Sequence, residues 1–418
     1  MQGFVRLISE ELDDLLDSTF PLNQSLPQVV AQKLPLTGFI AKPTLPQCEI
    51  SVAIPVRNEA DQLDSTLRAV TAQVDCAGNR FDPRRFEILI LANNCADESA
   101  AVVRQWQLKP SLPPIHLAEI ELPPAQANCG RARQIVMDAA FTRLKKLKKS
   151  RAVIASTDGD TRVASDWIAM TLSEIHRGAD AVSGRIMIRP NELANMDVNT
   201  RRYHLRDVYY RHLVAELEGY LAPVPSDPHP RHHQHFNASF AVTVETYQRA
   251  GGVPSVTHLE DFAFYQSLLR IDARFRHSPQ VKVFTSARAH GRTSCGLSTQ
   301  LAEWAEMGNR CESYFVEGLN ELEARFICFQ KLRQLWQCAS TGNLIDFNQV
   351  TTLSEVLCVK DSWLMLETSS SKTFGSLRQA VERKQREIGI WRVRYALVPV
   401  EEAIASFRLR LEKLRHSA

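Results

Sequence analysis

The sequence lacks long apolar runs, paired cysteine motifs and any large excess of charge, and each absence excludes a class of protein. No stretch approaches the roughly 18 apolar residues that a membrane-spanning helix needs, so no integral membrane segment is expected. The nine cysteines are scattered and never spaced as CxxC, which argues against zinc knuckles and disulfide frameworks and favours a reducing compartment. The net charge of +3, from 50 Lys and Arg against 47 Asp and Glu, is too small to attract nucleic acid by itself.

What remains is the composition of an ordinary globular protein. The chain has 418 residues, of which 44% are hydrophobic and 23% charged, enough for one large domain or two ordinary ones. Its first residues, MQGFVRLISEELDDLLD, place acidic residues among apolar ones at helical spacing, unlike a signal peptide. We therefore expect a soluble, cytoplasmic protein that has an N-terminal helix and an extended lead-in over residues 1–48.

From residue 49 onward, short apolar segments rich in β-branched residues alternate with helical ones. Strands are predicted at 50–56, 86–92, 115–120, 152–157 and 181–188. Helices are predicted between them at 59–74, 97–108, 127–148 and 164–177. This alternation is typical of an α/β protein with a parallel sheet.

The second half of the chain is predicted to be more helical. A long helix is expected from Pro190 to about residue 221, followed by the proline-rich loop APVPSDPHPRHHQHF and a turn-rich stretch at 237–254. The histidines of that loop lack the spacing of a zinc finger, so we expect a mobile loop rather than a metal site. A helix near Leu259 and a strand at 281–286 complete an α/β domain at 49–292, and helical periodicity predicts a helical C-terminal region at 293–418.

Polar motifs follow three of the predicted strands, at the edge where open parallel sheets bind ligands. They are PVRNE at 55–59, ANNCAD at 92–97 and TDGDT at 157–161. In the first two, helix N-capping is an equally good explanation for the Asn and Asp residues. Asp158 and Asp160 are more specific, because carboxylates one residue apart repel each other unless a cation lies beside them, although a solvated turn is the alternative. Mg²⁺ or Mn²⁺ prefers such oxygen ligands.

Together these motifs resemble the family 2 glycosyltransferases, which have the nucleotide-sugar-binding GT-A fold. The resemblance covers about residues 49–292 and rests on PVRNE, the Asn93 to Asp97 segment, the Asp158-Gly159-Asp160 triplet (a DxD motif), and Gly251-Gly252 followed by Glu260-Asp261. It implies a Rossmann-like GT-A core with a mainly parallel sheet. It also implies a metal-dependent, inverting transfer of a sugar from a nucleotide-diphosphate donor to a small-molecule, lipid or glycan acceptor.

The resemblance further implies roles for individual residues. Asp261, beside Glu260, is expected to be the catalytic base, and Asp160 with Asp158 to bind Mg²⁺ or Mn²⁺, with His290 as a further candidate metal ligand. The expected nucleotide-binding residues are Pro55, Arg57, Glu59, Asn93, Asn94, Asp97, Arg131, Arg133 and Asp158. For the two arginines, which open a predicted helix, surface solubility is the alternative.

The sequence also departs from the family pattern. Asn93 and Asn94 stand where many members have an aspartate, and no QxxRW motif follows Asp261, which disfavours the processive polymer synthases. In place of that motif, Arg288 or Arg292 could clamp a phosphate. Two other functions stay open. A nucleotidyltransferase function is disfavoured because the sequence lacks a Gly-rich GGxSxRM-like loop. A non-catalytic nucleotide-sugar-binding or scaffold function is disfavoured because Asp158, Asp160 and Asp261 are all present.

Overall fold

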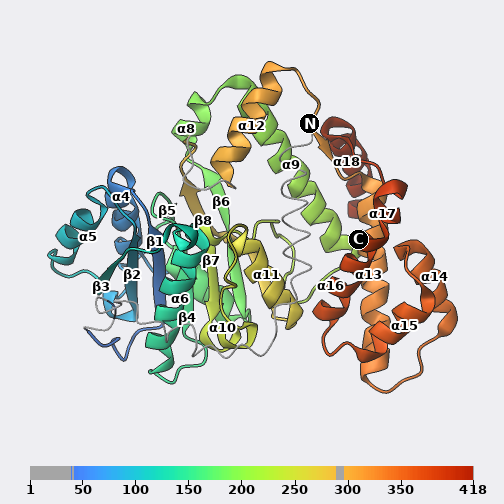
Figure 1. Cartoon of the computed structure of the whole chain (residues 1–418), viewed down its shortest axis with the longest axis horizontal. Helices are drawn as coiled ribbons and strands as arrows, with labels where there is room; N and C mark the ends of the chain where they lie inside the picture. Colours follow the sequence, from blue (N-terminus) through green and yellow to red (C-terminus); the bar gives the residue numbers. More distant parts are fainter. Residues whose placement is uncertain (1–38, 40–41, 289–295, 418) are drawn as a thin grey trace.

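The computed structural model of the chain describes residues 39, 42–288 and 296–417 (Figure 1). The helix predicted near the N-terminus lies outside the described residues, as do His290 and Arg292. Within the described ranges, no helix combines the length and the apolar character needed to cross a membrane.

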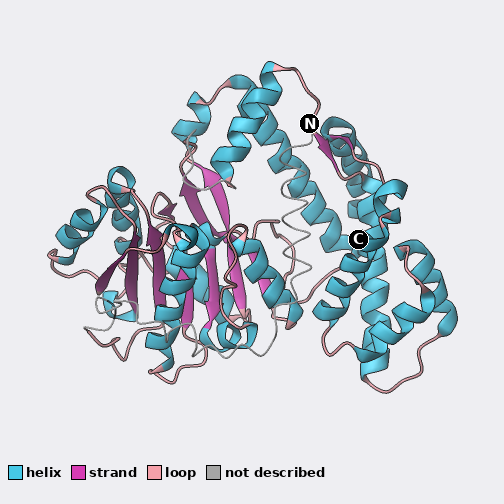
Figure 2. Ribbon diagram, viewed as in Figure 1, coloured by secondary structure: helices cyan, strands magenta, loops and turns pink. Residues whose placement is uncertain are grey.

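One eight-stranded sheet forms the α/β part of the molecule, in the order β3-β2-β1-β4-β7-β6-β8-β5 (Figure 2). Its strands are β1 (Ile50–Val56), β2 (Phe86–Asn93), β3 (Ile115–Ile120), β4 (Val153–Ser156), β5 (Arg162–Val163), β6 (Ala181–Ile188), β7 (Phe240–Thr243) and β8 (Phe275–Thr285). β1 pairs in parallel with β2 and β4, β2 with β3, and β6 with β8. The predicted α/β class with a mainly parallel sheet is confirmed.

The stretch at 237–254 was predicted to be turn-rich, and this prediction was wrong. It contains the short η3 helix (Asn237–Ser239), strand β7, and α10 (Val244–Ala250). β7 lies antiparallel between β4 and β6. All four of its residues are buried, so the strand shows no alternation of apolar and polar side chains by which the sequence could reveal it.

Helices cover both faces of the sheet, and each face has its own apolar core. One core contains residues of α6 (Cys129–Lys145), α10 and α11 (Glu260–Arg270), and the other contains residues of α4 (Ala60–Thr71), α5 (Ser99–Gln107) and α7 (Trp167–His176). Successive residues of β1 point to opposite cores: Ala53 lies in the first, Val52 and Ile54 in the second. Short 3-10 turns precede β2 and α6 at η1 (Pro83–Arg85) and η2 (Pro124–Gln126).

The rest of the described chain is mainly helical, which confirms the predicted C-terminal helical region. Figure 1 shows α9 running from the sheet part toward these helices. Their bounds are α8 (Pro190–Asn195), α9 (Val198–Leu221), α12 (Leu297–Asn309), α13 (Leu319–Ser340), α14 (Phe347–Leu357), α15 (Asp361–Ser370), α16 (Phe374–Ile388), α17 (Ile390–Arg394) and α18 (Val400–Ser417), with a small sheet of β9 (Phe315–Val316) and β10 (Val398–Pro399). Tyr210 and Leu217 of α9 share an apolar core with Phe326 of α13 and Phe407 of α18. The domain boundary at residue 292 stays a prediction.

A close contact joins the end of α11 to the start of α16. Asp272 accepts hydrogen bonds from the backbone N–H groups of Phe374 (2.9 Å) and Gly375 (2.7 Å) at the beginning of α16. A Cβ atom on Gly375 would lie 1.7 Å from the carbonyl oxygen of Leu269, so only glycine fits there. The helix that begins with Glu260 and Asp261 is therefore fixed at its far end by the helical part of the molecule.

Candidate active site

The acidic triplet lies where the sequence predicted it, directly after β4. Asp160 is buried, whereas the side chain of Asp158 is about a third exposed. A Cβ atom on Gly159 would lie 3.1 Å from Cγ of Glu59 and 3.3 Å from Cγ2 of Val56. The absence of a side chain at Gly159 therefore lets the triplet lie against the end of β1.

Two arginines lie beside the two carboxylates of the triplet. Arg133 Nη2 donates to Asp158 Oδ1 at 2.6 Å, and Arg288 Nη2 lies 3.1 Å from Asp160 Oδ2. Guanidinium groups of the chain itself thus supply positive charge where carboxylate repulsion required a cation. Burial, reinforced by the charge of Asp158, still raises the pKa of Asp160 to about 6, so Arg288 only partly offsets the cost of burying this carboxylate.

Glu59 joins the β1 end of the site to Arg288. Its two carboxylate oxygens accept from Arg288 Nη1 (2.9 Å) and Nη2 (2.8 Å), which is a bidentate pair. The backbone N–H of Glu59 donates to Ser99 Oγ at 2.8 Å, and that hydroxyl donates to Asp97 Oδ1 at 2.6 Å. Asp97 therefore supports the Glu59 turn, and Ser99, a residue that the sequence analysis did not single out, is the link between them.

The other predicted nucleotide-binding residues lie near this edge with varied contacts. Asn94 accepts from the Leu122 backbone N–H and donates to its carbonyl oxygen, both at 3.0 Å, and so ties the ends of β2 and β3 together. Arg57 donates to the Ala127 carbonyl oxygen at 2.7 Å, and Arg131 to Gln134 Oε1 at 2.7 Å. Asn93 is buried at the end of β2, and Pro55 lies within β1. Their roles toward a nucleotide stay predictions.

Arg133 connects the triplet to the Glu260-Asp261 pair. Its guanidinium is almost fully buried and donates to Asp158, to Ser156 Oγ at 2.6 Å and to Glu260 Oε1 at 3.3 Å. A Cβ atom on Gly130 would lie 3.1 Å from Cβ of Glu260, so the starts of α6 and α11 are in close contact. One arginine therefore holds together two motifs that are about 100 residues apart in the sequence.

Asp261 lies in the first turn of α11, next to Glu260. Its Oδ1 accepts from the Phe262 backbone N–H at 2.8 Å. Burial, followed by the negative charge of Glu260, raises the pKa of Asp261 to about 7, although Arg133 acts in the opposite direction. A carboxyl group with this pKa can take up a proton near neutral pH, which is the property of a general base.

Arg189 is a further site residue that the sequence analysis missed. It follows β6, is buried, and donates from Nη2 to the carbonyl oxygen of Asp160. Its Nη1 donates to Gln62 Oε1 (2.9 Å) and Glu192 Oε1 (3.0 Å). An arginine directly after a buried strand and before a proline was the available signal, because charged residues are rarely buried without partners.

Comparison with known proteins identifies the domain. The model of "Glycosyl transferase family 2" matches residues 51–227, which include strands β1 to β6, the acidic triplet and Arg133. Residues 51–227 belong to glycosyl transferase family 2. Glu260, Asp261 and Arg288 lie beyond this family 2 match and are brought to it by the fold.

Individual relatives of the family 2 domain are distant. Glycosyltransferase AglE of Haloferax volcanii is 27% identical over 138 residues, which are 33% of this chain and 39% of AglE. The chain thus matches well under half the length of this curated relative. S. aureus TarS (1–349, with UDP-GlcNAc) has 12% identity and a TM-score of 0.39, with 81% of this chain and 92% of TarS covered. The mannosyltransferase PcManGT of Pyrobaculum calidifontis (with GDP-Man and Mn²⁺) has 15% identity and a TM-score of 0.39, with 84% and 93% covered.

The donor atoms of the family 2 site suit a hard divalent ion. In the described part of the chain, no group of three or more His, Cys, Asp and Glu side chains is placed to hold a metal by itself. Mg²⁺ commonly uses only one or two protein carboxylates and completes its shell with waters and substrate phosphates. Asp160 and Asp158 provide two such carboxylates, so the residues fit an ion that binds together with a diphosphate.

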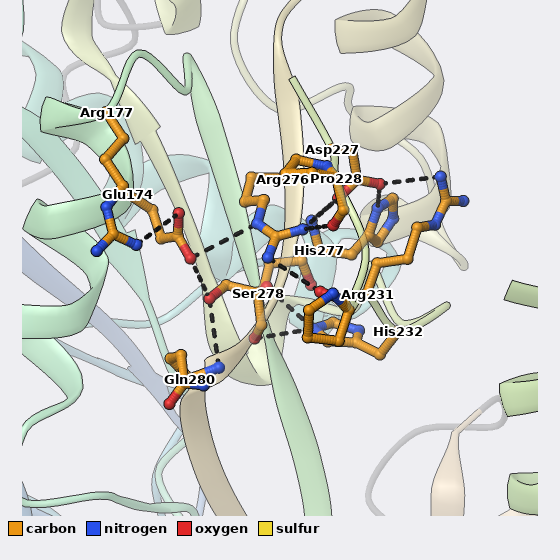
Figure 3. Close-up of polar contacts among 12 residues, drawn as sticks. Glu174, Arg177, Asp227, Pro228, Arg231, His232, Arg276, His277, Ser278 and Gln280 are labelled. Atoms are coloured by element: carbon orange, nitrogen blue, oxygen red, sulfur yellow. Dashed lines mark hydrogen bonds and ion pairs between the residues drawn. The ribbon is translucent and has the colours of Figure 1, made fainter. Parts of the chain in front are cut away.

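The proline-rich loop at 222–236 is not the mobile loop that we predicted. Figure 3 shows it packed against β8 in a network of buried charges. Asp227 accepts from His277 Nδ1 at 2.7 Å and from Arg276 Nη1 at 3.1 Å, and Arg231 lies 3.3 Å from it. His232 Nε2 lies 3.2 Å from the carbonyl oxygens of residues 183 and 278. The prediction was wrong because prolines exclude regular structure without preventing a loop from being packed.

Proposed function

We propose that this chain is a glycosyltransferase that moves a sugar from a nucleoside-diphosphate donor to a hydroxyl acceptor, with Asp261 as the catalytic base. The observation that carries the proposal is the Arg133 bridge. One buried guanidinium binds both Asp158, in the acidic triplet of the family 2 domain, and Glu260, the neighbour of Asp261. A donor-binding motif and a general base in one connected site are what glycosyl transfer to a hydroxyl requires.

The reaction follows from the charges of these groups. The acceptor oxygen attacks the anomeric carbon as the bond from that carbon to the diphosphate oxygen breaks, and Asp261 takes the hydroxyl proton. Because the pKa of Asp261 is raised to about 7, its carboxylate is both available and basic enough near neutral pH. A bound Mg²⁺ or Mn²⁺ would neutralise the leaving diphosphate as a Lewis acid. A single displacement of this kind inverts the anomeric configuration.

Donor binding can be tested by thermal shift with UDP and GDP, each with and without Mn²⁺. A ligand that binds only the folded protein raises its Tm. We expect one of the two nucleotides to raise the Tm with Mn²⁺ present, and Asp160→Asn to remove most of this shift. Arg104→Gln, which changes an exposed charged residue outside the site, is the control. A shift of equal size without metal, or in Asp160→Asn, would contradict a metal at the triplet.

Transfer itself can be tested with labelled sugar nucleotides and extract fractions that supply small-molecule, lipid and glycan acceptors. We expect label to move to one acceptor class, and Asp261→Asn to stop the transfer. Nucleotide binding without transfer or donor hydrolysis under any condition would favour a non-catalytic binding protein. The cytoplasmic location expected from the cysteines stays a prediction.

A further inference from the structure

Arg288 pairs with two carboxylates that come from different parts of the site. It is the described residue that contacts both Glu59, at the end of β1, and Asp160, in the triplet. Both carboxylates are largely buried, with side-chain exposures of 9% and 12%, whereas the Arg288 side chain is 30% exposed. A single guanidinium therefore compensates two buried negative charges from the more open side of the site.

The contacts of Arg133 and Arg288 differ in a way that predicts different mobility. Arg133 is 3% exposed and bonded to a hydroxyl as well as to two carboxylates. Among the residues that the structure describes, Arg288 pairs with the carboxylates of Glu59 and Asp160. The two residues before it are held in place, since Glu192 Oε2 accepts from the Ala287 N–H at 2.6 Å and from Ser286 Oγ at 3.2 Å. The Arg288 side chain can thus swing by rotamer changes without moving the chain that carries it.

We propose that Arg288 is an exchangeable internal cation, which holds Glu59 and Asp160 in the donor-free site and passes to the diphosphate when the metal reaches Asp160. This inference rests on the proposed function. Arg288 Nη2 lies 3.1 Å from Asp160 Oδ2, the oxygen side of the carboxylate that a metal ion would also approach, so the two cations compete for the same negative charge. A diphosphate brings new negative charge that can receive the released guanidinium in a bidentate pair. Metal and nucleotide should therefore bind cooperatively, each favouring the other.

The competition can be measured without any transfer reaction. Mn²⁺ is titrated into the protein alone, and the unbound ion is followed by electron paramagnetic resonance. In Arg288→Met, which keeps an unbranched apolar side chain and removes the charge, we expect Mn²⁺ to bind about tenfold more tightly than in the wild type, because the positive charge that competes for Asp160 is gone. With Mn²⁺ saturating, UDP or GDP should bind about tenfold more weakly to Arg288→Met than to the wild type.

Arg85→Met is the matched control. Arg85 also forms a bidentate pair with a glutamate, Glu49, at 3.0 and 2.8 Å, but before β1 rather than after it. The two arginine side chains are similarly exposed, 37% for Arg85 and 30% for Arg288. This variant should leave Mn²⁺ binding unchanged. Circular dichroism of all variants checks that they are folded.

The outcomes separate this inference from the proposed function. Unchanged or weaker Mn²⁺ binding in Arg288→Met overturns the exchange, even if UDP or GDP binds the wild type with Mn²⁺. If Arg288→Met binds Mn²⁺ more tightly than the wild type and the double variant Arg288→Met, Asp160→Asn does not, competition at Asp160 is supported. If Mn²⁺ binds more tightly to Arg288→Met while neither nucleotide binds the wild type, the competition between Arg288 and the metal is supported and the proposed donor site is contradicted.

Discussion

Two clusters of buried charges lie at the same sheet and differ in how their carboxylates are paired. The loop cluster joins the 222–236 loop to β8 and α7, and consists of Glu174, Asp227, Arg231, Arg276 and His277. The site cluster lies at the ends of β1 and β4, and consists of Glu59, Arg133, Asp158, Asp160, Glu260, Asp261 and Arg288. When Glu218, which pairs with Arg231, and Arg189, which bonds to Asp160, are counted as well, the loop cluster has three basic side chains for three acids, whereas the site cluster has three for five.

This difference appears in the pKa values of the acids. His277 and the neighbouring arginines outweigh burial and hold the pKa of Asp227 far below its usual range. In the site cluster burial prevails, and the pKa rises to about 6 at Asp160 and to about 7 at Asp261. Carboxylates whose charge is compensated by neighbouring cations stabilise the fold. Carboxylates whose charge is only partly compensated retain affinity for a metal ion or a proton. This difference supports a structural role for the loop cluster and, under the proposed function, a catalytic role for the site cluster.

The largest expected effect concerns the proposed base. Asp261→Asn should lower kcat for transfer by about 10²- to 10⁴-fold, because the amide cannot accept the proton, and should leave nucleotide binding unchanged. The measurement is initial-rate kinetics beside nucleotide titration. Asp138→Asn is the control, since burial also raises the pKa of Asp138 to about 6, but its carboxylate binds Tyr247 inside the core. Equal loss of kcat in both variants would mean that buried aspartates matter here only for folding.

For the loop cluster, the expected effect is on the free energy of unfolding rather than on kcat. Asp227→Asn leaves several buried cations short of a partner and should lower the free energy of unfolding by about 3–5 kcal/mol. Urea unfolding followed by circular dichroism measures this change. Asp82→Asn, which removes an exposed pair with Arg84, should leave the midpoint unchanged. If Asp227→Asn unfolds at the wild-type midpoint, the loop cluster does not stabilise the fold.

The position of α11, which carries Glu260 and Asp261, also depends on its contact with α16 outside the site cluster. Gly375→Ala places a methyl group against the Leu269 carbonyl oxygen and should lower the free energy of unfolding by about 1–3 kcal/mol, with a fall in kcat because α11 shifts. The control is Gly219→Ala in the last turn of α9, where an added Cβ atom meets nothing within 4 Å. That variant should be slightly stabilising. Equal stability and kcat in Gly375→Ala would show that α11 is positioned by the sheet alone.

The sequence predicted part of this comparison and not the rest. β3 and β6 have the predicted bounds because apolar, β-branched runs with helices between them indicate parallel strands. Asp158 and Asp160 were found because they follow such a strand. The partners of these acids were not predictable, since Arg133 and Glu260 are 127 residues apart and Arg288 and Glu59 are 229 residues apart. Repulsion between carboxylates predicts that a cation is present, but the fold decides whether arginine or metal supplies it.

The smallest expected effect is on the pH dependence of stability, where the two clusters should differ in sign. The pKa of Asp261 is raised from 3.8 to about 7 in the folded state, so between about pH 4 and 7 the folded protein binds more protons than the unfolded chain. This group therefore makes the protein more stable as the pH falls through that window. The pKa of Asp227 is lowered, so its contribution is complete above about pH 4 and is lost as the pH falls further.

The two variants separate these contributions. Asp261→Asn should reduce the gain in the urea midpoint that the wild type shows between pH 7 and pH 5, because the amide does not titrate. The rest of the gain should remain, since burial also raises the pKa values of Asp138 and Asp160 to about 6. Asp227→Asn should keep that gain, although its midpoint is lower throughout, and should instead flatten the loss below about pH 4. A gain of undiminished size in Asp261→Asn would assign the protons to other carboxyls, such as Asp138 and Asp160, whose pKa values burial raises to about 6. Asp261 would then take up no proton in this pH range, and a base at the start of α11 would have lost its physical support.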